Sequence, residues 1–145
     1  MRAVLFFGLA FIISCSSLSP EEKTVLKAVT SYNVALIQTY GDVNLNYMQF
    51  FASEAEIKKL FPIIQALMAS GNRMVARQDE FVVKSIKIKG DAATLRAEEK
   101  WTYWWEDVYT GEVTKPKAEQ KYKINYMLKK VNGRWIVDSL KPWGK

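Results

Sequence analysis

The chain has 145 residues, 49% of them hydrophobic and 25% charged, which is enough apolar material for one globular domain with a real core. It has no histidine and one cysteine, which excludes histidine proton shuttles, Cys/His zinc sites and intramolecular disulfides. The net charge of +6 is mild, and acids are interspersed among the lysines. We therefore expect no nucleic-acid partner, no metal and no cofactor.

The first 14 residues have the pattern of an export signal. Arg2 supplies a positive charge, and the apolar run that follows is too short to cross a bilayer of about 30 Å. The sequence Ile12-Ile13-Ser14-Cys15 resembles the lipobox of bacterial lipoprotein signal peptides. The resemblance implies cleavage before Cys15 and a lipid on its thiol, which anchors the chain to a membrane. An ordinary signal peptide cut near Ser16, with Cys15 discarded, is the alternative.

Lipidation predicts a location in the cell envelope. Ser16 after the cysteine resembles the outer-membrane sorting pattern, which implies an outer membrane facing the periplasm if the host is Gram-negative. Residues 15–19 are then the lipidated cysteine and a short tether, and residues 20–145 form one domain. Because the tether is short, we expect this domain to lie close to the bilayer.

The first part of the mature chain has helical periodicity. Ser19 and Glu22 form a capping box, and Gly41 is placed to end a helix over residues 20–40. Asp42 is positioned to cap a short second helix. Another capping sequence at Ser53 predicts a third helix, with a kink at Pro62 and an end at Gly71-Asn72. The third helix is expected to face the core through Ile57, Leu60, Phe61, Ile64, Leu67 and Met68.

After about residue 80 the period changes to two residues, which predicts strands. Gly90-Asp91 and Asn132-Gly133 predict tight turns, and a loop is expected around Lys115 and Pro116. The faces expected to be apolar are Val82, Lys84, Ile86 and Ile88 in the first strand; Ala93, Leu95, Ala97, Glu99, Trp101, Tyr103 and Trp105 in the second; Tyr122, Ile124, Tyr126 and Leu128 in the third; and Trp135, Val137 and Ser139 in the last.

Helices followed by a meander of long antiparallel strands predict an α+β domain in which a curved sheet wraps the helices. This order, the aromatic-rich strand around Trp101 and the ending from Tyr126 to Val137 resemble the nuclear transport factor 2-like, or cystatin-like, cone fold. The resemblance implies a pocket between the sheet and the helices. It also implies that a homodimer could form through the convex sheet face. Because enzymes and non-enzymes share the fold, it indicates no activity.

Glu99 is the candidate functional residue, because alternation places its carboxylate on the apolar face, where burial raises the pKa. A two-residue turn at Gly90-Asp91 would make Lys84 its diagonal neighbour. The pair could be a partly solvated ion pair at the open end of the cone. Alternatively, Glu99 orients a ligand or acts as a general base, with Tyr103 or Tyr126 donating hydrogen bonds. A register slip of one residue would instead turn both charged groups outward.

The tryptophans have two interpretations. Trp101, Tyr103 and Trp105 share a face that is either core or a platform for a ligand. Trp104 points the other way, near Lys121 and Lys123, so it packs under a loop or marks an interaction surface. Trp143 is expected to cover an edge of the sheet.

Two functions follow from these residues. The first is a membrane-anchored, non-catalytic binding or scaffolding module that holds an envelope protein or a small apolar ligand. The second is an enzyme resembling ketosteroid isomerases or dehydratases, in which a pocket carboxylate moves a proton and a tyrosine stabilises an enolate. The lack of histidine counts against a dehydratase dyad.

Overall fold

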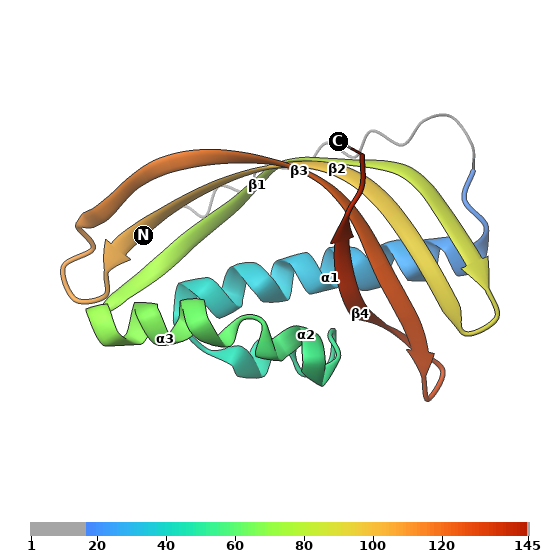
Figure 1. Ribbon diagram of the computed structural model, residues 1–145, viewed down its shortest axis with the longest axis horizontal. Helices are drawn as coiled ribbons and strands as arrows, with labels where there is room; N and C mark the ends of the chain where they lie inside the picture. The colour runs from blue at the N-terminus through green and yellow to red at the C-terminus, as the bar shows by residue number, and fades with distance from the viewer. Residues whose placement is uncertain (1–16, 145) are drawn as a thin grey trace, which may run out of the picture.

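In the computed structural model, residues 17–144 form an α+β structure whose helices lie on the concave side of a curved antiparallel sheet (Figure 1). The strands lie side by side in the order β1-β2-β3-β4. The predicted fold class is confirmed, and the predicted signal sequence and Cys15 lie outside the described residues. The helices are α1 (Pro20–Asp42), the 3-10 helix η1 (Leu45–Met48), α2 (Glu54–Lys58) and α3 (Phe61–Ser70), and the strands are β1 (Asn72–Lys89), β2 (Ala92–Asp107), β3 (Val113–Val131) and β4 (Arg134–Pro142).

Helix α1 begins as predicted and ends slightly later. The Ser19 hydroxyl accepts from the Glu22 amide at 3.2 Å, and the Glu22 carboxylate accepts from the Ser19 amide at 3.2 Å. The helix continues through Gly41 and ends where Val43 adopts a left-handed conformation with φ of 53°. Asn44, rather than Asp42, caps η1 by accepting from the Asn46 amide at 2.9 Å. The predicted cap at Asp42 is therefore wrong.

The predicted third helix is two helices, α2 and α3. Pro62 lies at the start of α3 instead of kinking a continuous helix, because proline is favourable in a first turn, where its missing N–H has no partner to lose. The break changes which residues face the sheet. Ile64 and Leu67 are buried as predicted, whereas Phe61 and Met68 are exposed, Met68 by 67%.

Strands β1 and β3 both begin earlier than predicted. β1 starts at Asn72, directly after the left-handed Gly71 that ends α3. β3 includes Lys115 and Pro116, which were expected in a loop. Tyr103 pairs with Ala118 and Trp105 with Lys115, so Pro116 lies within a bulge. A proline is tolerated there because a bulged residue is not required to donate to the ladder.

Bulges also change which face some strand residues occupy. β1 has register shifts between Gln78 and Glu80 and between Val83 and Ser85. As a result Phe81 is buried, with 2% of its surface exposed, and Val83 packs against the core, whereas the predicted inward residue Val82 does not. A similar shift in the β3–β4 ladder turns Leu140, and not Ser139, toward the core.

The core lies between α1 and the concave face of the sheet. It contains Val25, Val29 and Tyr32 from α1 together with Leu95 from β2 and Val137 from β4. A second cluster forms at the other end of α1, where Met74, Ile64 and Leu67 pack with Tyr103 and Trp105. Both clusters use the inward positions of β2, so the alternation predicted for that strand is confirmed.

The bulges of β1 can be tested with two neighbouring substitutions. We expect Phe81→Ala to lower the free energy of unfolding by about 3–5 kcal/mol, the usual cost of removing a buried aromatic ring. Val82→Ala, on the convex face, should cost about 1 kcal/mol or less. Urea unfolding of both variants measures the difference. The unbulged register predicts the opposite order, so a larger loss for Val82→Ala would contradict the structure.

Candidate functional site

Glu99 is the buried carboxylate at the centre of the concave face. It lies on an inward position of β2, and 5% of its surface is exposed. The Tyr126 hydroxyl of β3 donates to Glu99 Oε1, and the indole Nε1 of Trp101 donates to Glu99 Oε2 at 2.6 Å. Both carboxylate oxygens are therefore held by buried groups of the protein itself.

The Asn33 side chain of α1 extends this network. Its amide is buried, and its Oδ1 lies 3.2 Å from Tyr126 Oη, while its Nδ2 has no hydrogen-bond partner among residues 17–144. The Tyr126 hydroxyl has one proton, which is directed to Glu99. The complementary orientation of Asn33 is therefore the one in which Nδ2 donates to Tyr126 Oη. In that orientation a chain of hydrogen bonds joins α1, β3 and β2.

Burial is the main influence on the pKa of Glu99. Removal from water penalises the carboxylate and raises the pKa above its ordinary value of 4.5. Hydrogen bonds from Tyr126 and Trp101 favour the charged form and oppose the shift, but burial exceeds them. Burial also raises the pKa of Tyr126, and the adjacent Glu99 adds to that shift. Both groups thus favour their neutral forms.

Lys84 is not a neighbour of Glu99. In the observed register Phe81 faces Glu99, and the bulge at Val83 turns Lys84 to the convex face. There Lys84 Nζ lies 3.6 Å from Glu98 Oε2. The predicted diagonal pair is therefore wrong. The alternative register slip would have turned both charged groups outward, but only Lys84 points outward. Among residues 17–144, no cation forms an ion pair with Glu99.

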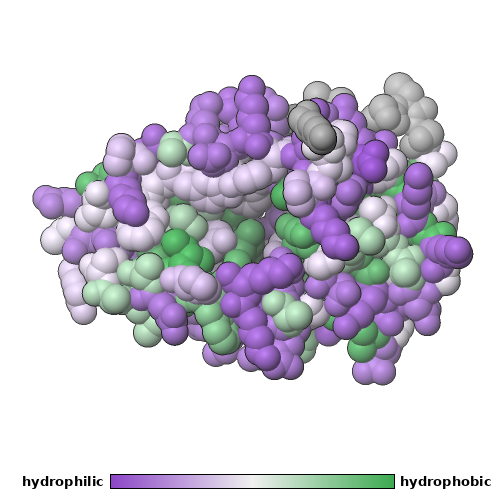
Figure 2. Space-filling view, viewed as in Figure 1, coloured by the Kyte–Doolittle hydropathy of each residue, from purple (hydrophilic) through white to green (hydrophobic). Residues whose placement is uncertain are grey.

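Trp101 and Tyr103 line the concave face beside Glu99. Their rings are stacked with centroids 5.8 Å apart and an interplanar angle of 3°. Burial raises the pKa of the Tyr103 hydroxyl, and the neighbouring Tyr122 hydroxyl adds to that shift. The structure thus brings Trp101 and Tyr126 into hydrogen bonds with the Glu99 carboxylate, while Tyr103 stacks on the Trp101 ring. In the view of Figure 2 the surface is hollowed between the sheet and the helices.

The convex face carries two tryptophans, each with two cations over its ring. Arg77 and Lys117 lie 5.9 and 4.7 Å from the Trp104 ring centroid, and Trp104 Nε1 donates to Glu106 Oε2 at 2.8 Å. Lys117 takes the place that was predicted for Lys121 and Lys123. The ring is half-buried among these side chains.

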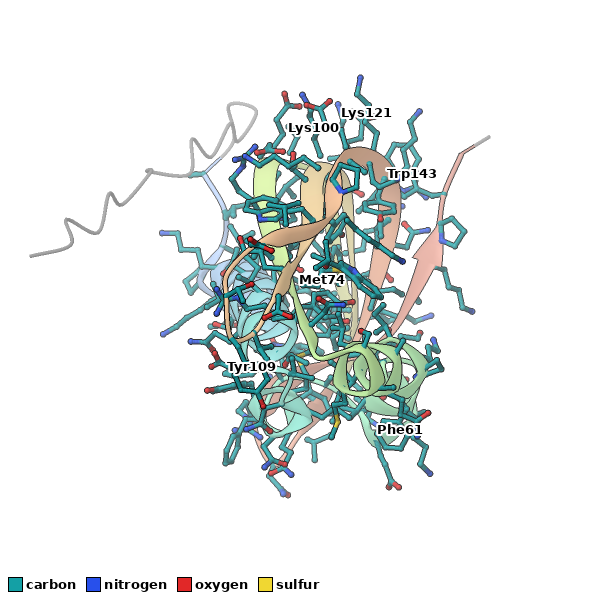
Figure 3. The ribbon with its side chains drawn as sticks, turned by 90° about the vertical axis from the view of Figure 1, so that its left-hand side faces the viewer. Phe61, Met74, Lys100, Tyr109, Lys121 and Trp143 are labelled. Atoms are coloured by element: carbon teal, nitrogen blue, oxygen red, sulfur yellow. The ribbon has the colours of Figure 1, made fainter. Side chains whose placement is uncertain are left out.

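Trp143 forms the second of these clusters. Arg96 lies 4.8 Å and Lys123 5.2 Å from its ring centroid, and its Nε1 donates to the Ala97 carbonyl at 3.1 Å. Arg96 and Lys123 come from β2 and β3, so the Trp143 ring lies across the convex face, while its backbone N–H donates to the Lys123 carbonyl at the outer edge of β3. Figure 3 shows Trp143 on the same side of the molecule as Lys100 and Lys121.

Comparison with known proteins shows similarity of structure without similarity of sequence. No protein-family model matches the sequence, and no curated protein sequence is similar to it. The intermembrane space region of the chloroplast protein ARC6 is 12% identical, with a TM-score of 0.72 over 90% of this chain and 100% of that one. A periplasmic fragment of TraM is 10% identical, with a TM-score of 0.56 over 89% and 100%. An NTF2-like superfamily protein from Salmonella enterica is 11% identical, with a TM-score of 0.50 over 86% and 92%.

The chain has the NTF2-like cone fold. In this cone Glu99 lies on the inner wall, and the Trp104 and Trp143 clusters lie on the outer wall. No helix within residues 17–144 is long and apolar enough to cross a membrane. In the same part of the chain, no three His, Cys, Asp or Glu side chains gather closely enough to hold a metal ion.

Sequence reasoning missed two polar residues of the inner wall of the cone, Asn33 and Gln78. Asn33 follows Tyr32 on the helical stripe that faces the core, so a polar residue on an apolar stripe was the available signal. Gln78 lies in the part of β1 that was not predicted as strand. The Trp143 position was not predictable, because it depends on the path of the chain after β4.

The raised pKa of Glu99 makes the stability of the cone depend on pH. The Glu99 carboxyl group binds its proton more tightly in the folded chain than in the unfolded chain. Protonated Glu99 therefore contributes its whole stabilisation below about pH 4.5, and this stabilisation is lost as the pH rises through the folded pKa. Glu99→Gln stays neutral and keeps hydrogen-bonding groups at both positions. The free energy of unfolding of the wild type, relative to this variant, should therefore fall as the pH rises above about 4.5.

Urea unfolding at a series of pH values measures this difference. Glu98→Gln is the matched control, because it removes the neighbouring carboxylate from the convex face. If the curves of the wild type and Glu99→Gln stay parallel at all pH values, Glu99 does not have a raised pKa in the folded chain.

Proposed function

We propose that the chain is a lipid-anchored, non-catalytic binding module of the cell envelope, which holds a protein partner on the convex face of its sheet. The observation that carries the proposal is the pair of tryptophan clusters on that face, in which Arg77 and Lys117 flank Trp104, and Arg96 and Lys123 flank Trp143. Tryptophan and arginine are the residues that most often dominate the energy of protein interfaces.

The arrangement of each cluster favours binding. The cations beside Trp104 come from the strands on either side of it, and those beside Trp143 come from the adjacent strands β2 and β3, so each ring and its cations are held together before a partner binds. Side chains that are already ordered lose less conformational entropy on binding. Their charged ends remain available to a partner's carboxylates, while the rings supply apolar area. An acidic protein surface therefore fits this face better than a neutral one.

The inner wall supports a binding role more than an enzymatic one. A general base must reach the proton that it removes, and both oxygens of Glu99 are engaged by Tyr126 and Trp101. The enzyme alternative has one observation in its favour, which is the raised pKa of a carboxyl hydrogen-bonded to a tyrosine. A substrate would need to displace one of these buried donors.

The anchor rests on the sequence around Cys15. Four residues, Ser16 to Ser19, separate this cysteine from the first residue of α1, and Ser19 is itself the helix cap. Two structural neighbours, the ARC6 region and the TraM fragment, are described as parts of proteins in an intermembrane space and in the periplasm. A position in an envelope compartment is consistent with those neighbours.

Lipidation is tested by labelling. We expect radiolabelled palmitate to enter the wild-type chain and not Cys15→Ser, and we expect only the wild type to sediment with membranes. Two acyl chains, at about 0.8 kcal/mol per buried CH₂, give stable attachment. Equal labelling of both chains would contradict the lipobox interpretation.

The convex face is tested by purification of the full chain with its partner. We expect Trp104→Ala to weaken that interaction by about 30-fold, the loss that follows from about 2 kcal/mol at an interface hot spot. Tyr109→Ala is the control, because Tyr109 is an exposed aromatic residue in the turn between β2 and β3. Equal binding by both variants would contradict the proposal. Turnover of a carbonyl substrate that Glu99→Gln abolishes without unfolding would favour the enzyme alternative.

A further inference from the structure

Strand β3 is much longer than the strand that covers its outer edge. β4 pairs with β3 from Val131 back to Ile124, where its last partner is Pro142. From Val113 to Tyr122, β3 pairs with β2 on one side, and no strand within residues 17–144 pairs with it on the other. Figure 1 shows β3 continuing well past the end of β4.

Two hydrogen bonds show which backbone groups face this open edge. The Lys123 carbonyl accepts from the Trp143 amide at 3.0 Å, so Lys123 faces the β4 side. The Lys130 amide donates to the Asp91 carbonyl at 2.8 Å, so residues of even number face β2. Backbone direction alternates along a strand. The N–H and C=O groups of Glu119 and Lys121 therefore point to the open edge.

A surface groove of about 490 Å³ lies where β4 ends beside β3. Its lining is largely apolar and includes Tyr122, Ile124, Leu140, Pro142 and Trp143. A strand that continued the line of β4 would enter this groove. Its side chains on one face would meet Tyr122 on the inner wall of the cone, and those on the other face would meet Lys121 and Lys123.

The positive charge beside the open edge of β3 determines which kind of strand can bind there. Lys100 and Lys121 are directly opposite each other in the β2–β3 ladder, where like charges repel. Lys100 lies 3.5 Å from Glu119, whereas no carboxylate of residues 17–144 forms an ion pair with Lys121 or Lys123. Edge lysines normally prevent a sheet from pairing with another copy of itself. The same lysines attract a strand that carries acids.

We propose that the open edge of β3 binds an extended acidic segment of the partner protein by strand addition, with Glu119 and Lys121 forming the backbone ladder. The bound segment alternates acidic residues, which face Lys121 and Lys123, with apolar residues, which face Tyr122. Main-chain hydrogen bonds supply affinity in this mode of recognition, and alternate side chains supply specificity. The inference rests on the proposed binding function, and it names the site and the chemistry of the partner.

The test compares two substitutions at one residue. Lys121→Ala and Lys121→Pro both remove the charged side chain, but only the proline removes the N–H that faces the edge, and neither touches the ladder with β2. The probe is a fluorescein-labelled nine-residue peptide of alternating glutamate and valine, and its binding to the purified full chain is followed by anisotropy. We expect the proline variant to bind about tenfold more weakly than the alanine variant. Equal binding would overturn strand pairing.

Two further probes make the result independent of how well the proline variant folds. A peptide N-methylated at alternate residues on one edge should bind the wild-type chain about tenfold more weakly than the unmodified peptide. A peptide of alternating lysine and valine should bind more weakly than the acidic one, and equal binding would overturn the acidic chemistry. A dimer of the chain that Lys121→Pro abolishes would show that a second copy occupies the edge, which also overturns the inference.

The outcome separates this inference from the proposed function. If Trp104→Ala releases the partner and the acidic peptide binds Lys121→Ala and Lys121→Pro equally, only strand addition is wrong. If the peptide depends on the Lys121 N–H and Trp104→Ala retains the partner, the convex face is wrong and the edge is the binding site.

Discussion

The buried carboxylate of Glu99 is the constraint that the inner wall of the cone is built around. A charge removed from water costs several kcal/mol unless it is neutralised or hydrogen-bonded. Here the partners are Trp101 from β2, Tyr126 from β3 and, through Tyr126, Asn33 from α1. The contacts of Tyr126 and Asn33 form only when β2, β3 and α1 are packed together. The carboxylate thus ties the register of β2 and β3 to the position of α1.

Two observations locate this network within the core. Tyr126 packs edge-on against Tyr32 of α1, with ring centroids 6.1 Å apart and an interplanar angle of 76°. Burial and the nearby carboxylates Glu56 and Glu99 raise the pKa of Tyr32. The concave face is therefore a mixed surface of aromatic rings with their hydroxyls. Removal of one donor from such a network leaves its acceptor buried without a partner, so it should destabilise the folded chain.

The sequence predicted the parts of the fold that depend on local periodicity. The alternation of β2 placed Glu99 and Trp101 inward, and Asn132-Gly133 forms the turn between β3 and β4. The bulges were not predictable, because a bulge adds a residue without changing the composition of a strand. One bulge moved Lys84 away from Glu99, and another allowed Pro116 inside β3. Both errors concern where two strands meet, which a period of two residues leaves open.

The same limit applies to the surfaces proposed for binding. Trp104 was expected to point outward from β2, which is local information, but its cations Arg77 and Lys117 come from β1 and from the bulge of β3. The open edge of β3 depends on where β4 ends, which is at Pro142, just before the Trp143 side chain crosses the convex face. A surface assembled from several strands is visible only when their lengths and registers are known.

The position of these surfaces relative to the chain start limits how the protein would work at a membrane. Lys130 lies 3.0 Å from Glu21, so the first turn of α1 is beside the β3–β4 turn. The other end of α1 packs through Tyr40 and Val43 against the cluster that includes Tyr103. The 23 residues of α1, at about 1.5 Å each, span roughly 34 Å.

A lipid on Cys15 would hold the start of α1 at the bilayer, while Trp104 and the open edge of β3 lie toward the other end of the helix. The domain would then stay close to the membrane, as the short tether predicts, and still present its binding surfaces about one helix length away from it.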